Sequence, residues 1–333
     1  MIRLGTVGTN WITQQLVEAA AASQQYELAG IYSREAATAK AFGERNHAQV
    51  NYTDYTQMLA QADLDVVYIA SPNSLHFAQA LEAIKRDISI IVEKPAFSNR
   101  REMTAIQAAL AQHPKVKFFE AARHVHTPNF HQIECAMAGL PTVQGANLTY
   151  MKYSSRYDQV LAGGRPNVFT PEFSGGALQD LGVYPVYLAV ALFGQPETVA
   201  YFPTLIATGA DGKGLAVLRY ADFDVAINFG KTSNSTAESE IYGLKDTIAL
   251  DSAGELTHVV FRDATGQETN LSEPALANPM TPEMADFARV LQDPDAPQNV
   301  ADYRRWLEWS LTVNQVLFDL RVAGNLRFPA DQN

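Results

Sequence analysis

The sequence predicts an α/β fold in two parts. The first is a doubly wound parallel sheet, and the second is an α+β domain with a large, mainly antiparallel open sheet. Strand-like and helix-like runs alternate strictly over residues 1–123, as in parallel strands joined by right-handed crossovers. Residues 124–333 contain apolar–polar alternation with few helices between, as in antiparallel sheets. We therefore predict domains at 1–123 and 124–333.

Each element of the first domain follows from its hydrophobic period. Predicted strands cover residues 2–7, 27–32, 65–70, 88–92 and 116–121, and predicted helices cover 12–22, 35–42, 74–85 and 100–112. In the second domain, predicted strands cover 142–153, 199–208, 215–220, 223–229 and 239–250. Predicted helices cover 126–138, 177–192, 282–291 and 302–323, with a bend or local disruption expected at Pro185.

Composition excludes several classes of partner. The 333 residues are 47% hydrophobic and 18% charged, as expected of a folded globular protein. A net charge of -11 disfavours binding to nucleic acid or to an anionic membrane. One cysteine, Cys135, leaves no internal disulfide and fits the reducing cytoplasm. No signal peptide and no apolar run of membrane-spanning length are expected.

The first strand ends in a turn that can hold phosphate. Gly8, Thr9, Asn10, Trp11 and Ile12 follow a strand and open a helix, which is the context of a dinucleotide-binding fingerprint. Only the first glycine of that fingerprint is present, so we expect Asn10 to adopt the left-handed turn. Backbone N–H groups around Trp11 and Ile12 are expected to face a pyrophosphate at the helix N-terminus. The alternative is an ordinary tight turn.

The second strand ends at Ser33 and Arg34, without the acidic residue that accepts from the ribose 2′-hydroxyl of NAD. A hydroxyl and a guanidinium can instead bind a 2′-phosphate. These residues therefore favour NADP(H) over NAD(H). The alternative is that Ser33 caps the next helix while Arg34 lies on its exposed face.

Two further strands end in polar turns. Ser71, Pro72 and Asn73 form a turn after residues 65–70, and His76 follows in the next helix, as either a structural or a functional histidine. The run 88–92 ends in Glu93-Lys94-Pro95. Pro95 cannot continue a central strand, and a lysine at the carboxyl edge of such a sheet can move a proton or anchor a ligand.

The second domain contains another pair of candidate residues. Asp180 and Tyr184 lie four residues apart on a predicted helix, so they share one face. Gly175 and Gly176 precede that helix and permit a close approach of backbone and ligand. A lysine ammonium near a phenol makes proton transfer feasible at neutral pH. The alternative is a tyrosine and an aspartate of an ordinary core helix.

A short stretch after residues 116–121 carries Arg123, His124 and His126, which can line the substrate end of a site. A His-x-His pair can also bind a metal ion, but no third ligand stands at a suitable spacing, so no metal is predicted.

Three landmarks follow one another along the chain: the glycine turn, Glu93-Lys94-Pro95, and Gly175-Gly176 leading to Asp180 and Tyr184. In this order, and over nearly the whole chain, they resemble the Gfo/Idh/MocA family of nicotinamide-dependent oxidoreductases. Tyr184, where many members carry histidine, most resembles the glucose–fructose oxidoreductase and dihydrodiol dehydrogenase branch. The resemblance implies a Rossmann domain, a cis peptide before Pro95, and a helix bearing Tyr184 across a cleft from Lys94. It also implies contact of the 71–76 segment with the cofactor.

By this resemblance, Lys94, Tyr184 and Asp180 are the catalytic residues, and Arg123, Asp180 and Tyr184 contact the substrate. The implied reaction moves hydride between nicotinamide and a secondary alcohol or ketone of a sugar, polyol or diol. Homodimers or homotetramers are expected to form through the open sheet. Two alternatives remain: a regulatory protein that senses nucleotide without catalysis, and a glycosidase that uses tightly bound NAD.

Overall fold

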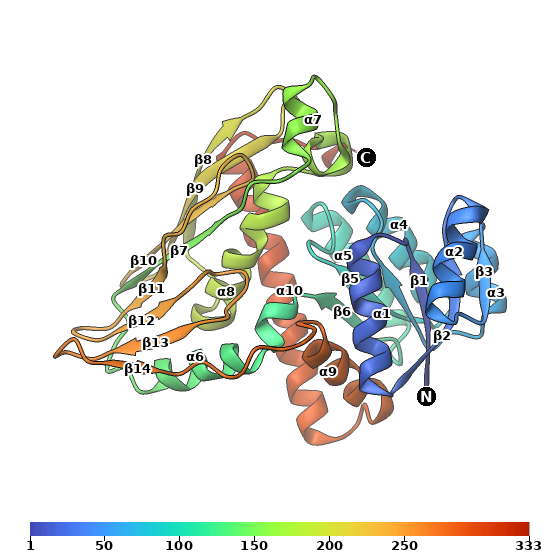
Figure 1. Ribbon diagram of the computed structural model, residues 1–333, viewed down its shortest axis with the longest axis horizontal. Helices are drawn as coiled ribbons and strands as arrows, with labels where there is room; N and C mark the ends of the chain where they lie inside the picture. Colours follow the sequence, from blue (N-terminus) through green and yellow to red (C-terminus); the bar gives the residue numbers. More distant parts are fainter. Residues whose placement is uncertain (333) are drawn as a thin grey trace. The chain divides into compact units, whose positions relative to one another are not determined.

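The computed structural model describes residues 1–332, which divide into two compact units. The first unit comprises residues 1–123 and 276–310, and the second comprises 124–275 and, of the described residues, 311–332. The break after Arg123 coincides with the predicted boundary, but the segment 276–310, expected in the second domain, packs with the first unit. Figure 1 shows the elements of each unit.

The sheet of the first unit is parallel throughout and has the order β3-β2-β1-β4-β5-β6. Its strands are β1 Ile2–Val7, β2 Tyr26–Tyr32, β3 Val50–Tyr52, β4 Val66–Ile69, β5 Ser89–Glu93 and β6 Phe118–Ala121. Its helices are α1 Trp11–Ser23, α2 Ala36–Asn46, α3 Tyr55–Gln61, α4 Asn73–Ile84, α5 Arg100–Gln112 and α9 Thr281–Gln292. Right-handed crossovers place α1 and α2 on one face and α4 and α5 on the other (Figure 1).

The predicted doubly wound sheet is confirmed, and its topology reverses between β1 and β4. Two elements, β3 and α3, were not predicted. In β3 only Tyr52 is buried, so the strand has no alternating pattern to detect. Helix α3 is one short segment whose N-terminus is capped by Asp54, where the carboxylate accepts from Gln57 N–H at 2.9 Å.

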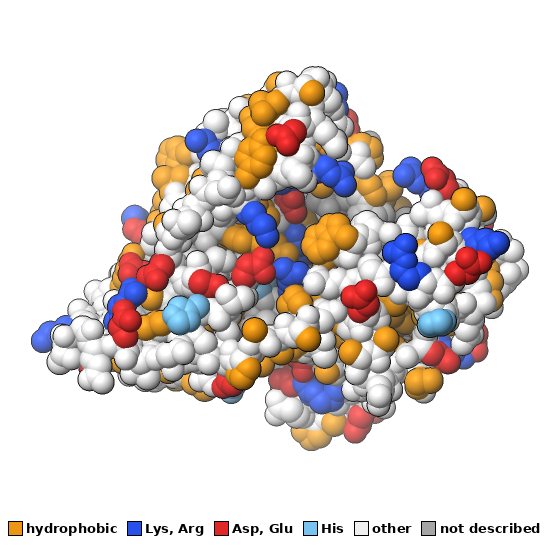
Figure 2. Space-filling model, in the orientation of Figure 1, with side chains coloured by type: hydrophobic (Ala, Val, Ile, Leu, Met, Phe, Trp, Pro, Cys, Tyr) orange, Lys and Arg blue, Asp and Glu red, His pale blue; other side chains and the backbone are white. Residues whose placement is uncertain are grey.

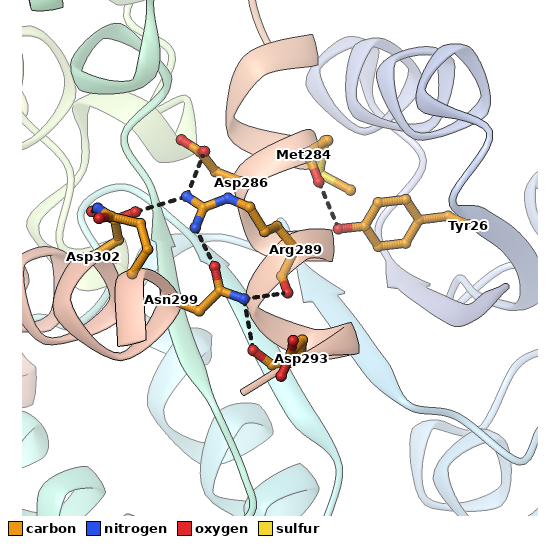
Figure 3. A network of polar contacts seen from close by, with 8 residues as sticks. Tyr26, Met284, Asp286, Arg289, Asp293, Asn299 and Asp302 are labelled. Atoms are coloured by element: carbon orange, nitrogen blue, oxygen red, sulfur yellow. Dashed lines mark hydrogen bonds and ion pairs between the residues drawn. The ribbon is translucent and has the colours of Figure 1, made fainter. Parts of the chain in front are cut away.

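Segment 276–310 joins the first unit through apolar and polar contacts. Phe287 of α9 stacks on Phe119 of β6 with ring centroids 4.5 Å apart, and Tyr26 Oη donates to the carbonyl of Met284 at 2.9 Å. Arg289 reaches the first turns of α10 (Pro297–Ala323), where it binds Asn299 and, at 2.9 Å, Asp302 (Figure 3). A helix that returns to an early sheet leaves no local sequence signal, which is why this packing was not predicted.

The sheet of the second unit has the order β14-β13-β12-β11-β7-β10-β9-β8 and is antiparallel except where β10 pairs with β7. Its strands are β7 Gly145–Met151, β8 Thr198–Leu205, β9 Asp211–Arg219, β10 Asp224–Gly230, β11 Ser239–Tyr242, β12 Thr247–Leu250, β13 Val259–Arg262 and β14 Glu268–Asn270. The predicted open, mainly antiparallel sheet is confirmed. The single run expected over 239–250 is a hairpin, and β13 and β14 are additional short strands.

The helices of the second unit are α6 Pro128–Ala138, α7 Tyr157–Leu161 and α8 Val183–Phe193, with a π-helical segment at Leu178–Gly182. Short 3-10 turns cover Asn167–Phe169, Pro171–Phe173 and Pro329–Asp331, and another, Arg123–His126, spans the boundary between the units. Helix α8 lies against one face of the sheet (Figure 1).

The helical stretch Pro171–Phe193 is long and apolar enough to cross a membrane, and 72% of its most apolar window is buried inside the protein. That burial is what a core helix requires. The π-helical segment of this stretch precedes Pro185, which lacks the N–H that would bond to the carbonyl of Leu181. The predicted disruption is thus present, one turn before the proline.

Charged side chains of both signs are interspersed on the face of the molecule shown in Figure 2. No large basic area interrupts that face.

Candidate active site

The candidate residues of the first unit follow the carboxyl ends of four neighbouring strands, β2, β1, β4 and β5. In an open α/β sheet, ligands bind outside this edge where the strand order reverses. Gly8 lies at the reversal with φ of +104°, and a Cβ there would meet the carbonyl oxygen of Ala70 at 3.1 Å. The β1 and β4 turns therefore approach each other as closely as they do because residue 8 is glycine.

Asn10 does not take the left-handed conformation that the fingerprint suggested. Its φ is -79°, and it is the N-cap of α1, where Oδ1 accepts from Ile12 N–H at 3.0 Å and Thr13 N–H at 3.1 Å. Gly8 alone makes the turn. Ile12 N–H donates to this cap, and the expectation that the N–H groups around Trp11 and Ile12 face a pyrophosphate stays a prediction. Trp11 at N1 is 70% exposed.

The end of β2 is followed by Ser33 and Arg34, the two residues predicted to bind a 2′-phosphate. Ser33 is held by its backbone N–H, which donates to the Tyr52 carbonyl at 3.1 Å. The N-cap of α2 is Glu35, so the alternative that Ser33 caps this helix is wrong. Arg34 is exposed, and its guanidinium forms no ion pair within residues 1–332, so it is available to an anion.

The β4–α4 turn is tied together by a buried histidine. His76 is fully buried, with Nε2 2.8 Å from the carbonyl oxygen of Ser71 and Nδ1 3.1 Å from that of Ala96. Burial lowers the pKa of the imidazole. His76 thus links the turn after β4 to the turn after β5. Pro72 is the N-cap of α4, and Asn73 is its first residue.

Strand β5 ends in a buried acid, a half-buried lysine and a cis proline. Tyr68 Oη donates to the Glu93 carboxylate, whose pKa is raised by burial. The predicted cis peptide between Lys94 and Pro95 is confirmed. Lys94 thus stands at the carboxyl edge of the sheet, as expected, directly after a buried acid.

Arg123 is also tied to the first unit. Its guanidinium donates to Gln15 Oε1 at 3.3 Å and lies close enough to Glu93 and Glu283 to lower the pKa of both carboxyls. Burial nevertheless raises the pKa of Glu283 well above its ordinary value, and neither of its oxygens accepts a hydrogen bond within the described chain. Whether Arg123 also contacts a substrate stays a prediction.

In the second unit, Asp180 lies in the π-helical segment and Tyr184 in the first turn of α8. The Tyr184 ring packs between those of His124, at 5.0 Å, and Tyr150, at 5.3 Å. His124 Nε2 also lies 3.1 Å from the Tyr184 carbonyl oxygen. Neighbours on both sides therefore hold the phenol in one orientation. π-Helical insertions are frequently found at functional sites.

The two glycines before this helix allow the chain to approach itself. A Cβ at Gly175 would meet the Asn167 carbonyl oxygen at 2.5 Å, and Gly176, at φ +141°, lies against the Asp211 carboxylate. Asp211 Oδ2 in turn accepts from Leu178 N–H at 2.7 Å. The glycines thus let a buried acid cap the helix that carries Asp180.

Sequence reasoning missed Asp211 and Lys231. The Lys231 ammonium forms an ion pair with Asp180, and its side chain is only 2% exposed. Lys231 directly follows β10, and a lysine at the end of a buried strand is rarely buried without a function. The same reasoning that singled out Lys94 could therefore have singled out Lys231. Asp211 begins an alternating strand and has no distinguishing local pattern.

Among residues 1–332, no group of three or more His, Cys, Asp or Glu side chains is arranged to hold a metal ion. His124 and His126, considered as a pair, lie on a single 3-10 turn. His124 instead packs on Tyr184 and Tyr187.

A glycine turn at a strand-order reversal, a lysine at the carboxyl edge and a helix bearing Asp180 and Tyr184 are the features expected of nicotinamide-dependent oxidoreductases. The chain belongs to the Gfo/Idh/MocA family of these enzymes. Residues 2–121 match the model of the oxidoreductase family with an NAD-binding Rossmann fold, and residues 147–249 match that of the GFO/IDH/MocA C-terminal domain. The predicted family and enzyme class are confirmed.

Two relatives match over their full lengths. YgjR of Escherichia coli K12, an uncharacterised oxidoreductase, is 36% identical over 99% of both chains. IolU of Bacillus subtilis 168, a scyllo-inositol 2-dehydrogenase (NADP(+)), is 34% identical over 100% of both chains. Among solved structures, a levoglucosan dehydrogenase in complex with NADH has a TM-score of 0.84 at 17% identity, over 97% of both chains. That likeness confirms the fold.

Proposed function

We propose that the chain is a cytoplasmic NADP(H)-linked dehydrogenase or reductase acting on a secondary alcohol or ketone of a polyol, sugar or diol. The observation that carries the proposal is the set of proton-carrying groups: Lys94 at the carboxyl edge of the first sheet, and Asp180 and Tyr184 on one helical segment of the second unit. A nicotinamide coenzyme, when bound, supplies the hydride-transfer chemistry that no side chain can supply.

The chain's own residues bind the substrate and manage its proton. In this proposal Tyr184 and Lys94 form a proton-transfer unit for the reacting oxygen, and Asp180 accepts a hydrogen bond from a substrate hydroxyl. Asp180 keeps 34% of its side chain exposed, which suits a group that contacts a ligand. Arg123 is proposed as a further substrate contact.

The proposed coenzyme contacts lie at the carboxyl edge of the first sheet. Residues 8–12 would hold the pyrophosphate, Ser33 and Arg34 the ribose 2′-phosphate, and residues 71–76 with Glu93, Lys94 and Pro95 the nicotinamide end. The exposed Arg34 and the absence of an acidic side chain at the end of β2 support NADP(H) over NAD(H). The name of the B. subtilis relative, which specifies NADP(+), supports the same choice.

Arg34→Ala is expected to weaken NADPH binding roughly 10- to 150-fold, because it removes one charge-assisted contact to the 2′-phosphate. NADH binding should change little. Both affinities can be measured by titrating coenzyme fluorescence. Arg45→Ala is the matched control, because it removes the same charge from the other end of α2 and should spare both coenzymes. Equal losses for NADPH and NADH in Arg34→Ala would rule out the assignment.

The substrate class can be tested with a panel of inositols, hexoses, pentoses and vicinal diols, assayed by nicotinamide absorbance with each coenzyme. The name of the full-length relative IolU places scyllo-inositol first on that panel. We expect turnover of at least one polyol with NADP(+). Tight NADPH binding with no turnover of any compound would instead favour the non-catalytic nucleotide sensor.

Association through the second sheet is proposed as well. Phe202 of β8 and Leu215 of β9 are register partners on the same face, and they are 63% and 38% exposed. Exposed apolar side chains paired on one face of a sheet are typical of a contact surface, which supports a homodimer or homotetramer built on this sheet.

A further inference from the structure

Lys231 is a buried cation whose ammonium contacts three groups of the second unit. It forms the ion pair with Asp180, donates to the Val168 carbonyl at 3.2 Å, and lies 4.2 Å from the centroid of the Phe169 ring. Lysine is almost never fully buried without a partner. The side chain therefore sits where it does because Asp180 is there.

The backbone of Lys231 is fixed on both sides. Its N–H donates to the Gly212 carbonyl at 2.8 Å, and its carbonyl accepts from Ser154 N–H at 2.9 Å. These bonds join the end of β10 to the β9 strand and to the chain that follows β7. An ammonium whose backbone is bonded to two other chain segments is held more firmly than one on an unpaired loop.

A second carboxylate, Asp211, lies near Lys231 but is bound by other donors. Its Oδ2 accepts from Tyr201 Oη and from Leu178 N–H, each at 2.7 Å, and burial raises its pKa. Asp211 thus holds the start of the helical segment, whereas the ammonium makes its direct ion pair with Asp180. Asp211 therefore caps the helical segment, and Asp180 pairs with the lysine.

Burying an ammonium costs several kcal/mol, and a buried ion pair is weak evidence for a stabilising role because an apolar side chain of similar volume often serves the core as well. The pair has a different consequence here. It fixes one side of a carboxylate whose side chain remains one-third exposed, and a nearby cation favours the ionised form. A carboxylate so held is prepared to accept a hydrogen bond from a ligand hydroxyl.

We propose that Lys231 is a positioning residue of this enzyme: it orients Asp180, so that Asp180 binds a substrate hydroxyl in the productive position. The inference rests on the proposed function, in which Asp180 contacts the polyol. Lys231 itself touches neither substrate nor coenzyme.

A double-mutant cycle tests this role. Lys231→Met, Asp180→Asn and the double variant are compared by kcat/KM with scyllo-inositol or the panel polyol that reacts fastest. Lys231→Met should lower kcat/KM about 10- to 100-fold. In the Asp180→Asn background it should change kcat/KM by no more than about 3-fold, because Lys231 acts through Asp180. The dissociation constant of NADPH should be unchanged in all variants.

Lys213→Met is the matched control, because Lys213 is exposed on β9 at the register position opposite Gly230. It should leave kcat/KM at the wild-type value. Multiplicative losses in the double variant, or wild-type kcat/KM in Lys231→Met, would overturn the proposal. The double variant also removes both charges together, so it guards against misfolding caused by an unpaired buried charge.

A wild-type chain that turns over no polyol would contradict the proposed function rather than this inference. The inference is then decided by crystal structures of the wild type and Lys231→Met. We expect the Asp180 carboxylate to change rotamer or position when the ammonium is removed. An Asp180 side chain that keeps its wild-type position would show that Lys231 does not orient it.

Discussion

Lys94→Ala and Tyr184→Phe should each lower kcat by roughly 10²- to 10⁴-fold, the loss expected when general acid–base assistance is removed. Their double variant should be little worse than the poorer single one, because residues that act as one unit have non-additive effects. Steady-state kinetics with the best panel substrate measures both. NADPH affinity, measured by fluorescence, should stay within a few-fold of wild type for Tyr184→Phe, which removes one oxygen.

Tyr187→Phe is the matched control for the phenol. Tyr187 lies in the same helix, is buried, and also packs on His124, so the substitution makes the same chemical change beside the proposed site. Its kcat should stay close to wild type. Normal turnover in Tyr184→Phe would assign the proton to Lys94 alone, and normal turnover in both single variants would refute the proton-transfer unit.

Gly176→Ala is expected to lower the free energy of unfolding by about 3–5 kcal/mol. At φ +141° an L-residue is strained, and the new Cβ would collide with the buried Asp211 carboxylate that caps the Asp180 helix. Urea denaturation measures the change as a lower midpoint at unchanged m-value. The start of the helix that carries Asp180 should shift as well, so activity should fall with stability.

Gly163→Ala separates the strain of a positive φ from the collision with Asp211. Gly163 also has a positive φ, +85°, but nothing lies within 4 Å of the position its Cβ would take. The free energy of unfolding of Gly163→Ala should therefore fall only by the cost of the backbone strain, about 1–2 kcal/mol. Equal losses at the two positions would mean that contact with Asp211 contributes nothing.

Much of the candidate site follows from strand ends alone. Gly8, Ser33, Ser71 and Lys94 each follow a predicted strand, and parallel strands bring their carboxyl ends to one edge of a sheet. The pattern of hydrophobic residues was therefore enough to group them. The conformation of Asn10 was not predictable in this way, because its choice between capping a helix and adopting a left-handed turn depends on the whole turn rather than on residue type.

The amino-acid sequence by itself determined the two-part α/β fold and the family, because periodicity, turn chemistry and motif order are local properties, and it singled out Lys94, Asp180 and Tyr184 as the proposed catalytic set. Only the tertiary structure revealed Lys231 beneath Asp180, Asp211 against Gly176, and α9 on the first sheet. Each of these depends on side chains distant in sequence meeting in a buried place. Burial gives a lysine or an aspartate its partner and its charge state, and no local pattern records which partner that is.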